Sequence, residues 1–281
     1  MFSGTFLVFL GAICWSLNAP LIKYLSIDSM TVNCLRCLMA GIIFLPRCMK
    51  SRIRKDRYFY IQIISFSLNC ILVCSALKMT GSAIAVGMQY TAAFWLFLFE
   101  TIRNRKIEYR KALPIVIIFF GIVAFMCSGG SGKAKGNILA FLSGICFAIM
   151  SFSGSRVESS EPLALTCIDC FTAAFISFLI RPTMIMSLLG IKTYEIIVIV
   201  VLGVVQTGLG YGLYNKGLRK TSPRNASLTA IWEMILGPVW VSLFLNEYPK
   251  KSELIGMLLV ISGLLVNAMI ETADSKKRKM V

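Results

Sequence analysis

The sequence predicts an all-α integral membrane protein with ten transmembrane helices arranged as two inverted five-helix repeats. Of its 281 residues, 57% are hydrophobic, and the mean hydropathy of +0.77 is higher than a soluble domain of this length would have. Long apolar segments alternate with short polar loops, and motifs of the first half recur in the second half. Composition, segment length and internal repetition therefore lead to the same fold class.

Ten apolar segments are long enough to cross a membrane, because about 20 apolar residues in a helix span a hydrocarbon core of about 30 Å. They cover residues 5–24, 31–49, 58–79, 82–100, 113–128, 137–155, 162–181, 195–216, 225–246 and 253–271. The loops that join them are short and leave no room for a soluble catalytic or ATP-binding domain. We expect the membrane part to be the whole protein.

The basic residues set the expected orientation. The net charge of +16 comes from Lys and Arg in the loops between apolar segments, which argues for topology determinants and against nucleic-acid binding. Most of the 29 basic residues fall on one side if both termini are cytoplasmic, including Lys276 and Lys279 in a basic tail over residues 272–281. We expect a multi-pass plasma-membrane protein with both termini in the cytoplasm. The first apolar segment lacks a preceding basic region, so we interpret it as a helix and not as a signal peptide.

The residue types limit the chemistry. The chain has no histidine, which excludes histidine-based acid-base catalysis and histidine metal ligands. Among the ten cysteines, two pairs have the spacing of redox or metal sites, although they lie inside apolar segments where cysteine behaves as a small hydrophobe: Cys34 with Cys37, and Cys167 with Cys170. We expect no cofactor, no metal and no enzymatic activity. A membrane thiol-redox protein remains a distant alternative.

The two halves of the chain share several motifs. Residues 4–14 align without gaps with residues 136–146, residues 76–80 align with 217–221, and Gly121 matches Gly263. We therefore divide the chain into repeats over residues 1–128 and 136–271. Because five is an odd number of helices, the second repeat must enter the membrane inverted. Inverted repeats around a site at the membrane midplane are a recurrent plan of secondary transporters.

Three short motifs carry a resemblance to a known family. Leu35-Arg36 precedes an apolar run to Pro46, residues 89–92 read QYTA, and Glu233 is followed by LGPVW at residues 236–240. Together with the duplicated halves, these motifs resemble the EamA-type drug/metabolite transporter superfamily over nearly the whole chain. The resemblance implies ten helices, cytoplasmic termini, alternating access and export or exchange of small organic metabolites, amino acids among them. The chain departs from the family at Ala93 and Met234, where the family usually has proline.

Glu233 is the principal candidate for a functional residue. It lies near the middle of the apolar segment 225–246, and an ionisable group inside a membrane is by default a functional-site hypothesis. Trp232 precedes it. Gly237-Pro238 follows about one helical turn later, where we expect it to disturb the helix and open space beside the carboxylate.

Two further charges lie within apolar segments at matching positions of the two repeats, Arg36 and Asp169. Each can serve assembly or function. From helix rise, Arg36 and Asp169 lie at opposite depths, which disfavours a direct pair, whereas Asp169 and Glu233 lie at similar depths. Because the chain lacks histidine, the carboxylates Glu233 and Asp169 are the candidate proton-coupling groups.

Polar and aromatic side chains within the segments complete the candidate site. Aromatic rings can stack on an apolar or cationic ligand, although they also serve in packing, and amides can bind substrate or join helices. Tyr214 and Asn69 are further candidates of this kind. The expected substrate-binding residues are Glu233, Trp232, Tyr90, Trp15, Asn18, Tyr211 and Arg36.

These features predict a secondary active transporter, an exporter or exchanger of small organic metabolites, with amino acids or similar zwitterions as the first expectation. The alternative is an organic-cation or multidrug exporter, in which Arg36 would have only a structural role. The expected partners are a small-molecule substrate and the lipid bilayer. A monomer of ten helices is sufficient to enclose a site, and a dimer is also compatible with the sequence.

Overall fold

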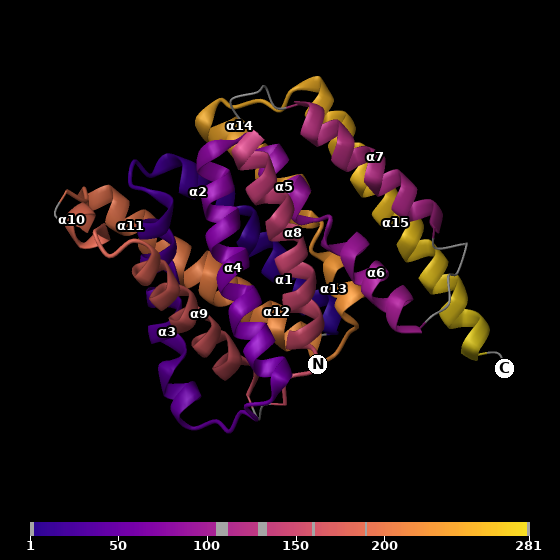
Figure 1. Ribbon diagram of the computed structural model, residues 1–281, viewed down its shortest axis with the longest axis horizontal. Helices are drawn as coiled ribbons and strands as arrows, with labels where there is room; N and C mark the ends of the chain where they lie inside the picture. The colour runs from indigo at the N-terminus through magenta and orange to yellow at the C-terminus, as the bar shows by residue number, and fades with distance from the viewer. Residues whose placement is uncertain (1–2, 105–111, 129–133, 159–160, 189, 280–281) are drawn as a thin grey trace.

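The computed structural model describes residues 3–104, 112–128, 134–158, 161–188 and 190–279, and its elements are helices. Figure 1 shows them as a bundle in which α1 begins, and α15 ends, toward the same edge. The helices are α1 (Gly4–Ser16), α2 (Asn18–Tyr24), α3 (Ser29–Met49), α4 (Arg57–Met79), α5 (Ser82–Gln89), α6 (Ala92–Asn104), α7 (Ala112–Ser128), α8 (Ala134–Gly154), α9 (Pro162–Ile180), α10 (Met184–Leu188), α11 (Thr193–Val201), the π-helix η3 (Leu202–Leu209), α12 (Gly210–Leu218), α13 (Pro223–Thr229), α14 (Trp232–Leu245) and α15 (Lys251–Lys279).

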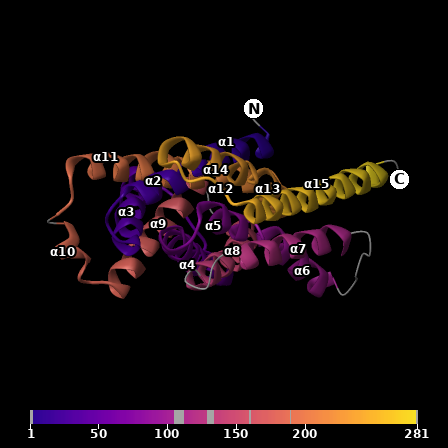
Figure 2. The same ribbon diagram turned by 90° about the horizontal axis from the view of Figure 1, so that it is seen from above.

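The predicted all-α membrane fold is confirmed. Within the described residues, eight helical stretches are long and apolar enough to cross a membrane. The other two expected segments form α7, which has 17 residues, and α15, which continues past its expected end at Glu271 to Lys279. Figures 1 and 2 both show α7 and α15 side by side, projecting from the side of the bundle opposite α3.

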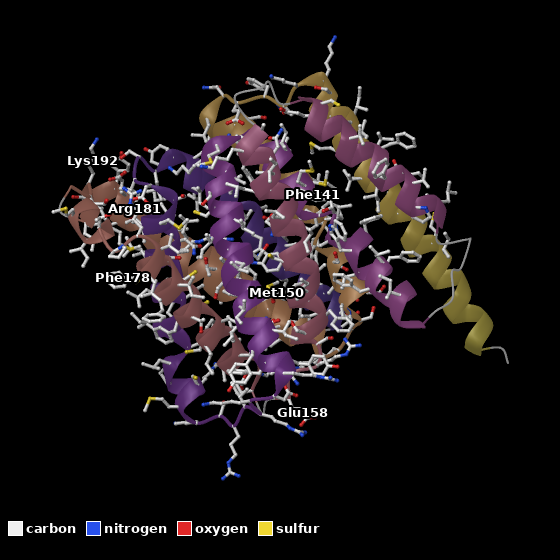
Figure 3. The ribbon with its side chains drawn as sticks, in the orientation of Figure 1. Phe141, Met150, Glu158, Phe178, Arg181 and Lys192 are labelled. Atoms are coloured by element: carbon white, nitrogen blue, oxygen red, sulfur yellow. The ribbon has the colours of Figure 1, made fainter. Side chains whose placement is uncertain are left out.

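Acidic side chains in the loops define where several helices begin. The Asp28 carboxylate accepts hydrogen bonds from the backbone N–H groups of Met30 and Thr31 at the start of α3, as an N-cap does. Arg181, labelled in Figure 3 at the end of α9, pairs with Asp28 at 3.2 Å. Burial raises the pKa of Asp28, but the hydrogen bonds from Thr31 and the charge of Arg181 outweigh it, so the pKa is lowered.

Charged contacts also join loops at the two ends of the bundle. Arg54 pairs with Glu158 at 3.1 Å between the α3–α4 and α8–α9 connections, and Figure 3 shows Glu158 at the lower edge of the molecule. Lys23, near the end of α2, pairs with Glu247 just after α14 at 2.5 Å. Burial raises the pKa of Glu247, whereas its hydrogen bonds and the charge of Lys23 lower it, and the net result is a lowered pKa.

Three expected helices are interrupted, which the sequence did not predict. The first divides at Leu17 between α1 and α2, the fourth at Tyr90-Thr91 between α5 and α6, and the ninth at Ala230-Ile231 between α13 and α14. The eighth contains η3, in which the backbone follows a π-helix. Polar or irregular backbone is tolerated at membrane depth where it is buried in protein.

α14 continues through Pro238 to Leu245, although Pro238 has no backbone N–H to donate within the helix. Neighbouring helices can compensate for the hydrogen bond that a proline lacks. The interruption instead precedes Trp232, so Glu233 lies in the first turn of α14 and not in the middle of a helix.

Small residues allow the helices to pack closely. A Cβ added at Gly4 would lie 2.8 Å from Lys220, and one at Gly136 would lie 2.9 Å from the Met79 side chain. These contacts bring α1 against α12 and α8 against α4, and α3 packs along α9 in the same bundle. Close approach at small residues is the usual way in which membrane helices associate, because lipid offers no hydrophobic driving force between them.

Candidate functional site

The interrupted helices bring Tyr90 and Glu233 together. Tyr90 directly follows α5, Glu233 is the second residue of α14, and both side chains are buried. The phenolic O–H of Tyr90 donates a hydrogen bond of 2.5 Å to Oε2 of Glu233. A helix N-terminus carries free backbone N–H groups and a partial positive charge, which stabilise a nearby carboxylate. The break in the ninth helix is therefore what makes a carboxylate tolerable at this depth.

Aromatic rings continue from Tyr90 into the bundle. Tyr90 lies 6.1 Å from Phe147 between ring centroids, and Phe147 lies 5.9 Å from Trp15. Trp15 in turn packs at 4.7 Å on Tyr211 and at 4.9 Å on Tyr214. These edge-on and tilted contacts join Tyr90, just after α5, to rings on α1, α8 and α12, and they form an aromatic wall next to Glu233.

Arg36 provides a buried positive charge. Its guanidinium donates to Oδ1 of Asn18 at 2.8 Å, to Oδ1 of Asn33 at 2.9 Å and 3.1 Å, to Oε1 of Gln206 at 3.3 Å and to the Cys70 carbonyl at 3.2 Å. A guanidinium has five N–H donors, so neutral oxygens occupy all of its capacity. In the described part of the chain the ion pairs join other residues. The guanidinium of Arg36 is thus held by hydrogen bonds to neutral oxygens and not by an ion pair with a carboxylate.

Arg36 and Glu233 are both buried and do not form an ion pair with each other. Asn18, at the start of α2, links them structurally, because it accepts from Arg36 and α2 packs against α14. A buried guanidinium and a buried carboxyl group, neither of them in an ion pair among the described residues, therefore lie in the same region. Such an arrangement is costly in a membrane unless a function retains it.

Asp169 forms a separate polar cluster. Its Oδ2 accepts from Nε2 of Gln62 at 3.1 Å, and Oε1 of Gln62 accepts from Ser153 at 3.1 Å. Its Oδ1 has no hydrogen-bond partner among the described residues. Asp169 bonds to neither Arg36 nor Glu233, so the structure does not show the two carboxylates as a contacting pair.

Most of the expected site residues converge. Trp15, Asn18, Arg36, Tyr90, Tyr211 and Glu233 are all buried and linked through the contacts above. Trp232 is not part of this group, because its side chain is 44% exposed and packs edge-on against Phe9 at 5.6 Å. Successive residues of a helix point in directions about 100° apart, so the residue beside a buried glutamate faces elsewhere.

Sequence reasoning missed several contributors. Asn33 and Gln206 bind Arg36, Gln62 binds Asp169, and Phe147 joins Tyr90 to Trp15. Asn33 lies three residues before Arg36 in α3, a helical spacing that could have indicated it. Phe147 has no such signal, since an aromatic residue in an apolar segment is indistinguishable from packing.

Some polar atoms at this site have free hydrogen-bonding capacity. Within the described residues, Nε1 of Trp15, Oδ1 of Asn69 and Oε1 of Gln89 are buried without a hydrogen-bond partner. Asn69 nevertheless holds Tyr211 through its Nδ2 group at 3.2 Å. Buried polar groups are normally satisfied, so free ones beside the aromatic wall indicate a place for water or a polar ligand.

All ten cysteines are free thiols, including both pairs with redox or metal spacing. In the part of the chain that the structure describes, no group of three or more Cys, Asp or Glu side chains is placed to hold a metal ion. The buried polar chemistry of the bundle therefore centres on Glu233, Arg36 and Asp169.

A bundle of apolar helices around buried, unneutralised charges defines a multi-pass membrane protein with an interior polar site. The chain belongs to the EamA-like transporter family, which matches residues 2–127 and again residues 134–269. The chain is also similar to a protein of Archaeoglobus fulgidus described as an uncharacterized transporter, with 20% identity over 266 residues that cover 94% of this chain and 95% of that protein. A crystal structure with 16% identity covers 95% of this chain and 97% of its own with a TM-score of 0.67, and this likeness supports the fold. The family and the relative indicate a transporter and not an enzyme.

Proposed function

We propose that the protein is a secondary active transporter that exports or exchanges small organic solutes bearing an ammonium group, with amino acids and similar zwitterions as the preferred class. The observation that carries this proposal is the buried Glu233 carboxylate, held by Tyr90 and without an ion-pair partner among the described residues. A ligand ammonium would supply the missing charge. The aromatic wall from Tyr90 to Trp15 would hold the rest of the ligand.

Arg36 favours a zwitterion over a simple cation. Arg36 and Glu233 are both buried and are connected through Asn18 and the packing of α2 against α14, so a ligand carrying both charges could lie between them. Its longest side-chain contact, 3.3 Å to Gln206, is the one that a ligand carboxylate would displace at least cost. A carboxylate also binds a guanidinium more strongly than a neutral amide does.

A second function, organic-cation or multidrug export, is favoured by a different observation. Neutral oxygens already occupy the donors of Arg36, so its charge can be satisfied without any ligand. In that case Glu233 and the aromatic rings alone would recognise the substrate. Arg36 would then join helices and have no contact with the solute.

The proposal includes alternating access by ten helices in two inverted repeats, and the packing of matched glycines supports it. A Cβ added at Gly121 would lie 2.8 Å from Val260, and one added at Gly263 would lie 2.6 Å from Ile118. Val260 lies three residues before Gly263, and Ile118 lies three residues before Gly121. A two-fold relation between α7 and α15 produces such a reciprocal pair of contacts. Gly4 contacts residues 217–221 at the end of α12, and Gly136 contacts residues 76–80 at the end of α4. These two segments align with each other in the two repeats, as Gly4 and Gly136 do. Inverted repeats commonly exchange roles as a transporter changes its open side.

Location and coupling complete the proposal. We place the protein in the plasma membrane with both termini in the cytoplasm, on the basis of the basic loops. Glu233 and Asp169 are the proton carriers that we propose, since buried carboxylates that become accessible in turn can pick up and release protons. The free Oδ1 of Asp169 supports a place for such a proton.

The test is solute flux in proteoliposomes, using radiolabelled amino acids and organic cations with and without a pH gradient. We expect amino-acid flux that depends on Glu233 and that the gradient accelerates. Arg36→Ala separates the two functions: loss of amino-acid flux supports the zwitterion site, whereas unchanged flux of cations alone would select the organic-cation exporter. The thermal stability of each variant is measured in parallel to exclude misfolding.

A further inference from the structure

A pocket lies apart from the Glu233 site, on the surface where α3 and α9 meet the helical segment formed by η3 and α12. Its volume is about 320 Å³, at the lower end of the range of about 300–1,000 Å³ typical of ligand pockets. All three helical segments are among the candidate membrane spans, so the pocket opens toward lipid.

The pocket has an apolar floor and apolar walls. A Cβ added at Gly212 would lie 2.9 Å from the Leu163 side chain and 3.3 Å from Phe44, so these two side chains cover the position where Gly212 leaves space. The walls include Ile43 and Leu209, which are 45% and 47% exposed. An apolar chain could enter from the side without displacing a hydrogen-bonded group.

Two basic residues lie at one end of this apolar surface. Arg47 follows Ile43 by about one helical turn, or about 6 Å along α3, and Lys216 lies about 10 Å beyond Leu209, the last residue of η3. Both are near the ends of their helices, at Met49 and Leu218. Within the described residues, neither side chain pairs with a carboxylate. The pocket is therefore amphipathic along its length, apolar toward the membrane interior and cationic toward the membrane surface.

We infer that this pocket binds one anionic phospholipid, with its phosphate between Arg47 and Lys216 and part of an acyl chain along Ile43 and Leu209. The apolar length excludes a free inorganic anion as the natural occupant, because such an anion would leave the walls unused. A neutral hydrocarbon is excluded because it would leave the charges of Arg47 and Lys216 without a partner. Basic pockets between membrane helices near the cytoplasmic surface are known to hold anionic head groups. The inference does not depend on the proposed transport function.

The experiment is native mass spectrometry of the full-length chain in detergent, titrated with phosphatidylglycerol and separately with phosphatidylcholine. We expect one tightly retained phosphatidylglycerol per chain and at least tenfold weaker retention of phosphatidylcholine. The variant Arg47→Gln/Lys216→Gln should bind phosphatidylglycerol at least tenfold more weakly. The matched control, Lys50→Gln/Lys55→Gln, removes the same charge from exposed positions outside the pocket and should change the binding less than twofold.

Three results would overturn the inference. The pocket variant could bind phosphatidylglycerol as tightly as the wild type, or the control variant could lose as much binding as the pocket variant, which would reduce the effect to overall charge. Inorganic phosphate at millimolar concentration could also displace the lipid, which would show that the acyl chain contributes nothing. A charge-preserving variant, Arg47→Lys/Lys216→Arg, should retain the lipid and identifies any loss that comes from misfolding.

Discussion

Tyr90 and Glu233 lie 143 positions apart in the sequence and meet through a 2.5 Å hydrogen bond where two interrupted helices approach each other. The hydroxyl group holds the carboxylate at the start of α14, beside the aromatic wall. This contact couples the fourth and ninth helical segments directly to the candidate site.

Tyr90→Phe should therefore impair transport while leaving the fold intact. The substitution removes the donor from a hydrogen bond to a charged group, which is worth about 1.5–3 kcal/mol, so flux should fall at least about tenfold. Initial rates in proteoliposomes measure the effect. Tyr214→Phe is the matched control, because it removes a buried hydroxyl bonded to Ser151 and not to Glu233. Equal losses in both variants would argue against a specific role for Tyr90.

Arg36→Lys should destabilise the protein. Lysine cannot reproduce the fork of hydrogen bonds to Asn18 and Asn33, and the buried amide oxygens left without donors each cost about 1–3 kcal/mol. Thermal unfolding in detergent measures the change. Arg54→Lys, at an exposed position paired with Glu158, should have little effect. A melting temperature for Arg36→Lys equal to that of the wild type would contradict the assigned network.

The Lys23–Glu247 pair predicts a dependence of stability on pH. The pKa of Glu247 is lowered in the folded protein, so the pair contributes fully at pH values above the unfolded pKa of about 4.3 and is lost as the pH falls through the lower folded value. The side chain of Glu247 is 37% exposed, so the contribution at neutral pH is at most about 1 kcal/mol.

Glu247→Gln should remove this contribution and reduce the fall in melting temperature between pH 6 and pH 3.5. Glu158→Gln is the control, because Glu158 is 69% exposed and its partner Arg54 lies in solvent. If Glu247→Gln and wild type lose stability in parallel as the pH falls, the pair does not make the expected contribution.

Gly263→Ala should destabilise the contact between α7 and α15. The new methyl group would lie 2.6 Å from Ile118 and 2.9 Å from the carbonyl oxygen of Pro114, and the backbone cannot move aside as a flexible side chain can. Overpacking of this kind costs about 1–3 kcal/mol. Gly190→Ala is the control, since no atom lies within 4 Å of its added Cβ. A stable Gly263→Ala variant would show that the two helices are not packed this closely.

The sequence predicted the parts of this molecule that depend on hydrophobicity over long segments. The ends of α3, α4 and α9 fall within two residues of the expected limits, because apolar length and capping residues such as Asp28 determine them. The interruption at Leu17 lies next to Pro20, which cannot donate a hydrogen bond to the Ser16 carbonyl, so the sequence held a local signal for it. The interruption at Tyr90-Thr91 has no proline within four residues and was not predictable in this way.

The site was predictable where a charge or an amide stood out in an apolar segment, as with Glu233 and Arg36. The site was not predictable where it depended on the direction in which a side chain points from its helix. Trp232 neighbours Glu233 in sequence but faces Phe9, because the position of the helix break sets the rotation of α14. Phe147 entered the site through tertiary packing alone.

The most direct test of the central claim is the flux of radiolabelled amino acids and organic cations into proteoliposomes containing either wild type or Glu233→Gln. Glutamine keeps the shape of the side chain and can still bond to Tyr90, but it lacks the charge. The account predicts that the wild type moves at least one ammonium-bearing solute and that Glu233→Gln moves it at least about tenfold more slowly, the loss expected for one charge-assisted contact. Equal flux through both proteins would contradict the claim that Glu233 binds the substrate or carries the coupled proton.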